Sequence, residues 1–181
     1  MRIIAKIKNR AAFSLTELLA AILILGMVST VVAGGIPVAR DAYNKITVSA
    51  NAQVLLSTTI SALRGQLGAA TIDKDVDAGD TLVFFSGKNG SSSKIDKSGA
   101  DGEMQIHEFW EYSDPASPYY NSSLAVPARP LMSGTDGLYA TYTKIGYSKY
   151  TGLVTVTGLT VKKDGKEKVT PVNVSIRIIG S

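Results

Sequence analysis

The sequence predicts an α+β fold in which one long N-terminal helix, suited to a membrane, packs on a small antiparallel β-sheet. Three observations support this fold class. Residues 18–36 contain no charged side chain. Apolar residues then recur at near-helical spacing as far as Leu67. Beyond residue 70 the pattern changes to short β-branched and aromatic segments separated by turn residues, which is typical of strands.

The first twelve residues form a short basic segment without an acidic residue. Its four cations are Arg2, Lys6, Lys8 and Arg10. The whole chain holds 19 Lys and Arg against 15 Asp and Glu, so the remainder holds 15 of each sign and has a formal charge of zero. The basic character therefore belongs to a leader at residues 1–12 and does not indicate a nucleic-acid-binding face.

The uncharged block LLAAILILGMVSTVVAGGI is 19 residues long. As a helix it would reach roughly 28 Å, close to the thickness of the hydrocarbon layer of a bilayer. Basic residues in front of such a block favour a cytoplasmic N-terminus, which places the rest of the chain outside the plasma membrane. We therefore expect residues 13–36 to form a transmembrane half-helix.

Gly34, Gly35 and Pro37 follow the apolar block and predict a kink in the helix, because proline removes one intrahelical hydrogen bond and crowds the preceding turn. Residues 37–68 are then expected to form an amphipathic half-helix. Its apolar positions, at near-helical spacing, are Ile46, Ala50, Leu56, Ile60, Leu63 and Leu67.

Residues 69–181 are expected to form an exposed, β-rich head of about four antiparallel strands. Strands are predicted at residues 81–85, near 104–112, and at 138–147, 153–161 and 169–179. The Asp-Gly pair within residues 162–168 predicts a hairpin turn. Residues 86–102 are rich in glycine and serine and predict a flexible surface loop, and residues 113–136 predict a long irregular connection.

The chain has no cysteine, which excludes a disulfide scaffold, a cysteine-based zinc site and a thiol nucleophile. His107 is the only histidine, and its place on a predicted strand favours a surface residue over a catalyst. No phosphate-cradling loop or nucleophile motif is visible. We therefore expect a protein that is not an enzyme and that has no cofactor and no metal site.

Two further groups of residues are weaker candidates for a binding site. Calcium coordination in the Gly-rich loop would use Asp96, Ser98, Asp101 and Glu103. Their spacing does not match an EF-hand loop, so a solvated loop is favoured. An aromatic sugar-binding face would use Trp110, Tyr112, Tyr119 and Tyr120. Core packing and loop anchoring explain these aromatic residues equally well and are favoured.

The most informative segment is residues 11–19, AAFSLTELL. A basic leader ends in the small residue Ala12, Phe13 follows, and Glu17 comes four positions later at the edge of the apolar helix. This combination resembles the prepilin signature of type IV pilins and pseudopilins, which is usually Gly followed by Phe-Thr-Leu-Ile-Glu. The resemblance covers approximately residues 6–40 and implies the pilin fold.

In that family a prepilin peptidase cuts before the Phe at the inner face of the membrane and methylates the new amine. The resemblance therefore implies a cleavage site between Ala12 and Phe13, and N-methylation of Phe13. Ala12 stands where glycine is most common, and a small residue still fits a tight cleavage pocket. Ser14 and Thr16 are more polar than the commonest residues at their positions, which we interpret as variation within the motif.

Glu17 is the candidate residue for assembly and register. A carboxylate costs roughly 2 to 4 kcal/mol near the centre of a bilayer on insertion scales, and less near its edge. The amine created at Phe13, in the same or a neighbouring subunit, is a suitable partner. A slip of one residue in a fibre would leave a buried charge unpaired, so the pair would set axial register. The alternative is that Glu17 lies in the interfacial region and is solvated.

The resemblance implies a filament subunit whose partners are other copies of itself or related pilins, the prepilin peptidase, an assembly ATPase and membrane platform, and the lipid bilayer before assembly. No direct nucleic-acid site is seen. The expected location is the plasma membrane, single-pass, and later a cell-surface or periplasm-spanning filament. Three alternatives remain. The chain could be a pseudopilin of a secretion or DNA-uptake system, an exported binding domain whose ordinary signal peptide is cut after Ala33, or an unprocessed single-pass anchor.

Overall fold

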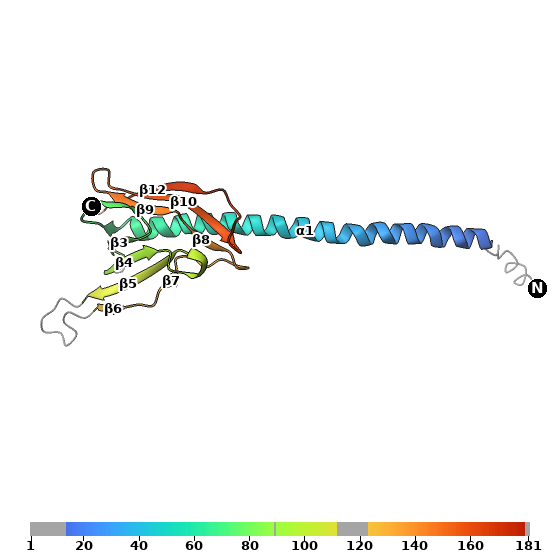
Figure 1. Ribbon diagram of the computed structural model, residues 1–181, viewed down its shortest axis with the longest axis horizontal. Helices are drawn as coiled ribbons and strands as arrows, with labels where there is room; N and C mark the ends of the chain where they lie inside the picture. Colours follow the sequence, from blue (N-terminus) through green and yellow to red (C-terminus); the bar gives the residue numbers. More distant parts are fainter. Residues whose placement is uncertain (1–13, 89, 112–122, 180–181) are drawn as a thin grey trace, which may run out of the picture. The chain divides into compact units, whose positions relative to one another are not determined.

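The computed structural model describes residues 14–88, 90–111 and 123–179, with the side chains of residues 110, 111 and 123–125 left out of the description. The chain divides into two units, Met1–Ile46 and Thr47–Ser181. We call them the N-terminal unit and the head. One α-helix, α1 (Leu15–Leu67), is 53 residues long and contributes to both units (Figure 1).

In the N-terminal unit, every described residue of α1 is exposed. The helical assignment continues through Gly34, Gly35 and Pro37 without a break. Proline at position 37 is thus accommodated inside the helix, and the kink expected there stays a prediction. The continuity confirms that one helix includes both the apolar block and the segment after it.

In the head, α1 buries one face against the sheets. The buried residues recur at intervals of three or four and are Ala52, Leu55, Leu56, Thr59, Leu63 and Leu67. The one hydroxyl on this face is satisfied, because Thr59 Oγ1 donates to the Leu55 carbonyl oxygen at 2.7 Å.

The sequence pattern located this buried face only in part. Leu63 and Leu67 are fully buried, whereas Ile46 and Ala50, which were expected on the same face, are exposed. The error has a simple cause. The buried face of α1 begins only at Ala52 and includes adjacent positions such as Leu55. A single row of apolar residues that is extended back to Ile46 therefore does not follow the buried face.

The first sheet contains six antiparallel strands in the order β1-β3-β4-β5-β6, with β7 also paired to β5. Its strands are β1 (Ala70–Thr71), β3 (Leu82–Ser86), β4 (Ser91–Asp96), β5 (Gln105–Glu111), β6 (Ser123–Ala125) and β7 (Arg129–Pro130). Alternate residues of β3 point inward: Leu82, Phe84 and Ser86 are buried, and Val83 and Phe85 are exposed.

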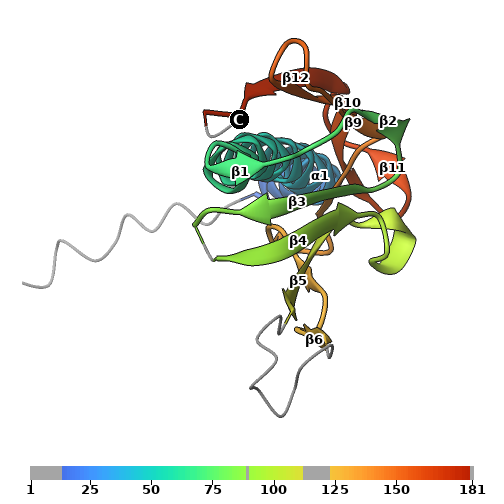
Figure 2. The same cartoon turned by 90° about the vertical axis from the view of Figure 1, so that its left-hand side faces the viewer.

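The second sheet is built around its longest strand, β10, which pairs antiparallel with β8, β9, β11 and β12, while β2 pairs with β9. Its strands are β2 (Val76–Gly79), β8 (Tyr139–Thr141), β9 (Lys144–Ser148), β10 (Leu153–Lys163), β11 (Lys166–Glu167) and β12 (Val172–Arg177). Figure 2 shows the head part of α1 between the two sheets, where side chains from all three layers form the core.

The α+β class is therefore confirmed, since one long apolar N-terminal helix packs against antiparallel sheets. The number of strands was underestimated. We expected one sheet of about four strands, and the described residues form two sheets of six strands each. Residues 138–147 are also divided into β8 and β9, and β6 and β7 lie within the expected irregular connection 113–136.

Residues 86–102 are not a flexible loop, and that prediction was wrong. They include β4 and a short 3₁₀-helix, η2 (Ala100–Gly102). In β4 the inward positions are Ser91, Ser93 and Ile95, all buried. Serine at two inward positions hides the hydrophobic alternation that would identify a strand. Pairing with β3 on one side and β5 on the other supplies the backbone hydrogen bonds instead.

The C-terminal strand matches its prediction closely. Val174, Ile176 and Ile178 are buried and alternate with exposed residues, and β12 pairs with β10 at five positions. Two further backbone bonds fix its end: Ile178 N–H donates to the Gly152 carbonyl oxygen at 3.0 Å, and Ile179 N–H to that of Gly68 at 3.1 Å. Backbone pairing thus holds the last strand in a chain without cysteine.

Candidate functional site

The first turn of α1 is organised by Ser14. The backbone N–H groups of Glu17 and Leu18 donate to the Ser14 carbonyl oxygen at 3.0 and 3.1 Å. The Ser14 hydroxyl accepts a second bond from the Glu17 N–H at 3.3 Å and lies 2.8 Å from the Thr16 hydroxyl. Ser14 is therefore the N-cap of the helix, and it satisfies N–H groups that have no partner within the helix.

This role was missed at the level of sequence, although a visible pattern could have revealed it. Ser14-Leu15-Thr16-Glu17 has the Ser-x-x-Glu spacing of a capping box. Glu17 also places a negative charge in the first turn, where it complements the positive end of the helix dipole. The polar residues that we interpreted as variation thus define where the helix begins.

The predicted cleavage and methylation residues, Ala12 and Phe13, lie outside the described residues and stay predictions. Glu17 is described, and its side chain is exposed. The ion pairs found among the described residues do not include it. A carboxylate at the start of an apolar helix therefore has no cationic neighbour in this part of its own chain.

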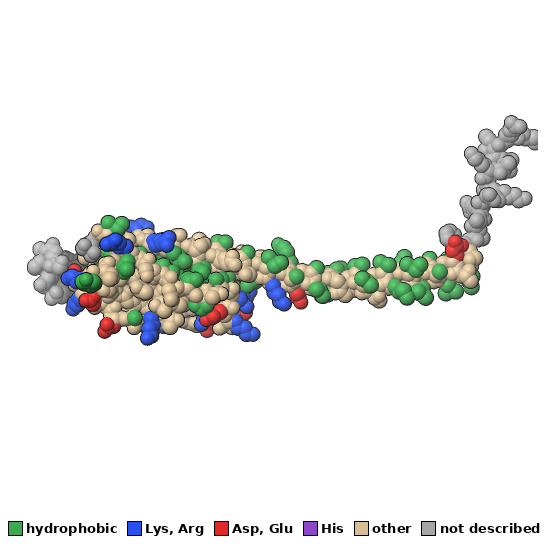
Figure 3. Space-filling view, turned by 90° about the horizontal axis from the view of Figure 1, so that it is seen from above, with side chains coloured by type: hydrophobic (Ala, Val, Ile, Leu, Met, Phe, Trp, Pro, Cys, Tyr) green, Lys and Arg blue, Asp and Glu red, His purple; other side chains and the backbone are tan. Residues whose placement is uncertain are grey.

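From Leu15 to Val38, α1 exposes many large hydrophobic side chains, and the face seen in Figure 3 shows hydrophobic side chains along this part of the helix. Large side chains are mostly uncovered, with Leu25 70% and Val31 74% exposed. Its polar side chains are satisfied internally: Ser29 Oγ donates to the Leu25 carbonyl oxygen and Thr30 Oγ1 to that of Met27, both at 2.7 Å. Hydroxyls bonded in this way do not oppose transfer into lipid.

Helix α1 is long and apolar enough to cross a membrane, judged by its length and composition. A helix of this length and composition is what a membrane anchor requires.

In the head, Asp96 lies in a polar cluster on β4. It is 2.8 Å from Lys94 Nζ and 3.1 Å from His107 Nε2, and it accepts hydrogen bonds from the Ser98 hydroxyl and backbone N–H. Burial raises the pKa of Asp96, but the bonds from Lys94 and Ser98 lower it more. His107 adds to that lowering, and the pKa of Asp96 lies well below its usual range.

His107 is not the free surface residue that its sequence context suggested. Only 18% of its side chain is exposed, and its ring stacks on Phe109 with 6.3 Å between centroids. The same nitrogen, Nε2, meets both Ser98 Oγ at 3.0 Å and Asp96 Oδ1 at 3.1 Å. A proton relay of the Ser-His-Asp kind uses both ring nitrogens, so this arrangement differs from such a relay.

The residues considered for calcium do not come together as a metal site. Asp96 and Ser98 contact each other, and the described residues contain no group of three or more His, Cys, Asp or Glu that could hold a metal ion. The aromatic sugar-binding face stays a prediction, because Tyr112, Tyr119, Tyr120 and the Trp110 side chain lie outside the described residues.

A second polar cluster joins the two sheets of the head. Lys97 Nζ is 2.6 Å from Asp80 Oδ1, donates to the Thr143 carbonyl oxygen at 3.1 Å, and lies 5.5 Å from the centre of the Tyr142 ring. The Tyr142 hydroxyl donates to the Asp80 carbonyl oxygen at 2.6 Å. Burial raises the pKa of Tyr142, so its hydroxyl remains a donor at any ordinary pH.

The fold and the first turn define a class of protein: a helix with an uncovered apolar surface continues into a folded head, which is a pilin-like architecture. Residues 7–33 match the family model of the prokaryotic N-terminal methylation motif. This motif is the hallmark of the prepilin-type signal of type IV pilins and pseudopilins. The chain therefore carries the signal of a type IV pilin-like or pseudopilin precursor. No curated protein and no solved structure matches it.

Proposed function

We propose that this chain is a structural subunit that is cut by a prepilin peptidase between Ala12 and Phe13, methylated at Phe13, and assembled into an extracellular helical filament. The proposal is supported by two features that occur in the same part of the chain. The methylation motif at residues 7–33 includes the capped start of a helix whose following turns are uncovered and apolar.

An apolar helix surface of this extent requires an apolar environment. Lipid supplies it before assembly, and the equivalent helices of other subunits supply it afterwards. Assembly then exchanges lipid contacts for helix contacts, which keeps its net cost small. Residues 1–12 act as leader, residues 13–36 as membrane and fibre-core segment, residues 37–68 as the half-helix that enters the head, and residues 69–181 as the exposed part.

Glu17 provides the register of the filament in this proposal. Cleavage removes the four cations of the leader and creates an amine at Phe13, one residue before the N-cap Ser14. The amine of the same or a neighbouring subunit pairs with Glu17 when lipid is exchanged for the fibre core. Because an unpaired buried charge is costly, only the register that forms the pair is stable.

The location follows from the same steps. The precursor is a single-pass protein of the plasma membrane with its head outside, and the product is a cell-surface or periplasm-spanning filament. Its partners are other subunits and the prepilin peptidase, with an assembly ATPase and membrane platform acting indirectly. A pseudopilin of a secretion or DNA-uptake system would use the same site, and that role differs only in the length and destination of the filament.

An exported domain with an ordinary signal peptide is disfavoured by the helix itself. Cleavage after Ala33 would cut α1 within its continuous span and leave Gly34 as the first residue. The first turn of the helix, with Ser14 and Glu17, would then be discarded.

The experiment compares Glu17→Ala with the matched control Asp41→Ala, since both acids are exposed on the N-terminal unit of α1. Filaments are counted by electron microscopy, and leader removal is checked by mass. We expect Glu17→Ala to be processed normally and to form at least tenfold fewer filaments, while Asp41→Ala resembles the parent. A Glu17→Ala protein that is processed and polymerises as well as the parent would contradict the proposal.

A further inference from the structure

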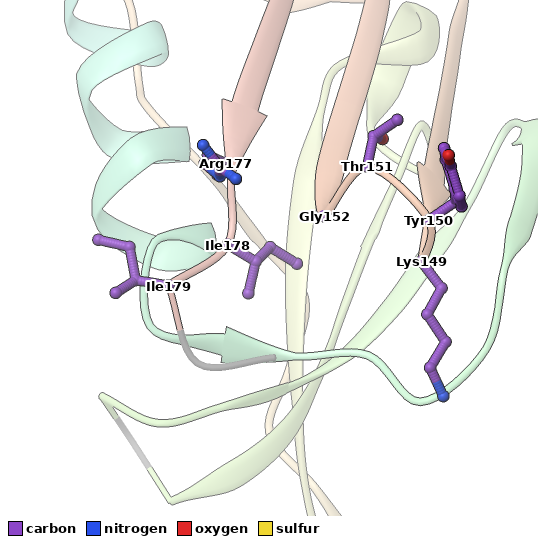
Figure 4. Close-up of a pocket in the computed structure, with 7 residues that line it drawn as sticks. All are labelled: Lys149, Tyr150, Thr151, Gly152, Arg177, Ile178 and Ile179. Atoms are coloured by element: carbon purple, nitrogen blue, oxygen red, sulfur yellow. The ribbon is translucent and has the colours of Figure 1, made fainter.

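One end of the head presents a surface made from the β9–β10 turn and the end of β12. A hollow of about 500 Å³ lies there, lined by Lys149, Tyr150, Thr151, Gly152, Arg177, Ile178 and Ile179 (Figure 4). We call it the tip surface. Two large side chains on it are almost fully uncovered, Tyr150 at 97% and Ile179 at 87% exposed. Arg177 and Lys149 are also exposed, so the surface combines apolar area with positive charge.

The backbone beneath these side chains is firmly held. Gly152 adopts a φ of 66° and its N–H donates to the Ser148 carbonyl oxygen at 2.9 Å, which closes the turn. Lys149 N–H donates to Asp75 Oδ1 at 2.6 Å, and its Nζ donates to the Asp73 carbonyl oxygen at 3.1 Å. Tyr150 and Ile179 are thus displayed on rigid segments and lose little backbone freedom when they meet a partner.

The chemistry of the tip surface is that of a protein contact. Tyrosine and arginine are among the residues that most often dominate the energy of protein interfaces, when they pack against a partner that excludes water. Tyr150, Arg177 and Ile179 offer such a group around one hollow. A partner that fits them supplies an apolar depression together with negative charge.

The opposite end of the same head carries three Asp-Gly turns. In each, both residues have positive φ: Asp101 and Gly102, Asp136 and Gly137, and Asp164 and Gly165. All three aspartates are exposed. We call this region the Asp-Gly end.

The three turns are gathered by β8. Thr141 of β8 donates to the Gly102 carbonyl oxygen at 2.6 Å, Asp136 and Gly137 lie just before β8, and Lys162 of the Asp164 hairpin pairs with Tyr139 of β8. Burial and then the charge of Asp101 raise the pKa of Tyr139, which agrees with a negative charge close to this strand.

Strand β10 separates the tip surface from the Asp-Gly end. It begins at Leu153, directly after Gly152 of the tip surface, and ends at Lys163, directly before Asp164 (Figure 1). At about 3.3 Å per residue, this strand is roughly 35 Å long. The positive, aromatic surface and the three aspartates therefore lie at opposite ends of one head. The Asp164 hairpin carries exposed side chains of both signs, Asp164 and Glu167 with Lys166. The two acidic residues of that end outside this hairpin turn are Asp101 and Asp136.

The geometry points to a contact between successive copies of this chain, in which the tip surface of one head packs against the Asp-Gly end of the next. Arg177 faces Asp101 and Asp136, and Tyr150 fills the space beside them. This inference rests on the proposed filament function and names the surface through which heads meet.

The arrangement also explains why the contact would propagate. Two different surfaces at opposite ends of one molecule form a heterologous interface, and such an interface repeats into an open helical assembly instead of closing as a symmetric dimer. A contact between heads then adds to the contacts between apolar helices, and the two together would fix the spacing along the filament.

The test uses the full-length chain expressed in filament-forming cells. Tyr150→Ala and Arg177→Glu are compared with the control Lys144→Glu, an exposed cation on β9 away from both ends. We expect the first two variants to reduce filament number or length at least tenfold, with normal leader removal and unchanged near-UV circular dichroism of the head, and the control to resemble the parent. Arg177→Glu combined with Asp101→Arg and Asp136→Arg should restore at least a third of the parent level.

The outcomes separate this inference from the proposed function. If the parent itself forms no filament, the proposed function fails. If the parent assembles and Arg177→Glu assembles equally well, only the head contact is overturned, and a simultaneous loss of surface adhesion would assign the tip surface to a foreign ligand. Failure of the combined charge reversal to restore assembly, despite loss in Arg177→Glu alone, would overturn the pairing with the Asp-Gly end.

Discussion

Helix α1 contains two stretches with the same secondary structure and opposite burial. From Leu15 to Ile46 every residue is exposed, whereas from Thr47 to Leu67 six residues are buried by the sheets of the head. The apolar residues are denser in the exposed stretch than in the buried one. The comparison teaches that the described fold leaves its most apolar surface uncovered, and a surface of this kind marks contact with a membrane or with protein.

The two stretches also treat polar side chains differently. In the exposed stretch, Ser29 and Thr30 bond to the helix backbone and need no external partner. In the head, Asp96 of β4 contacts His107 of β5 within the first sheet, and Lys97 contacts Asp80 and the Thr143 carbonyl oxygen. Each region therefore carries the polar chemistry that its environment permits.

The largest expected effect distinguishes buried from exposed leucines on this one helix. Leu63→Ala removes a fully buried side chain and should lower the free energy of unfolding of the head by about 2–5 kcal/mol. Leu23→Ala, at a position 58% exposed, should change it by less than about 0.5 kcal/mol. Urea unfolding in detergent, followed by near-UV circular dichroism, measures both. Equal effects would show that the two stretches do not differ as described.

The next largest effect concerns membrane insertion, which we expect to depend on the first stretch of α1 and not on the second. Met27 lies at the middle of the uncharged block, and Met27→Lys should weaken insertion by about 2.5–3.5 kcal/mol, roughly a hundredfold in partitioning. Val54→Lys is a matched control, because Met27 and Val54 are each 61% exposed. The inserted fraction is measured after carbonate extraction of membranes. An equal loss of insertion in both variants would argue against a membrane role confined to the first stretch.

The smallest effect is a pH dependence expected only in the head. The pKa of Asp96 is lowered in the folded state, so its stabilising contribution is complete above the unfolded pKa of about 3.9 and is lost as the pH falls below that value. Asp96→Asn should destabilise the head by about 1.5–3 kcal/mol at pH 7 and should flatten the decline below pH 4. Asp77→Asn, on an exposed residue, serves as control. Unchanged acid sensitivity in Asp96→Asn would contradict this account, and membrane attachment should not respond to either change.

Much of the fold could be predicted from sequence because strong periodic patterns determine it. The uncharged block predicted the first half of α1, and the alternation around Val174 and Ile176 predicted β12. Strand β4 escaped prediction because serine at its inward positions gives no hydrophobic signal. The second sheet was also underestimated, since short strands such as β8 and β11 depend on pairing with the long strand β10 rather than on their own composition.

The candidate site was likewise predicted in part from the sequence. The spacing of Phe13 and Glu17 relative to the leader predicted the methylation motif, which the family match at residues 7–33 confirms. The capping role of Ser14 could be predicted only from the Ser-x-x-Glu spacing with Glu17, because the resemblance to the prepilin signature carries no information about the helix cap. The contact between His107 and Asp96 could not be predicted from the sequence, because these residues become neighbours only when β4 and β5 pair.

The central claim is that cleavage between Ala12 and Phe13 creates the N-terminus that the filament requires. Mass spectrometry of the mature protein isolated from the cell surface tests this claim most directly. The account predicts an N-terminal peptide that begins with N-methylated Phe13 and contains Glu17. A surface protein that retains residues 1–12, or one that begins at Gly34, would contradict it.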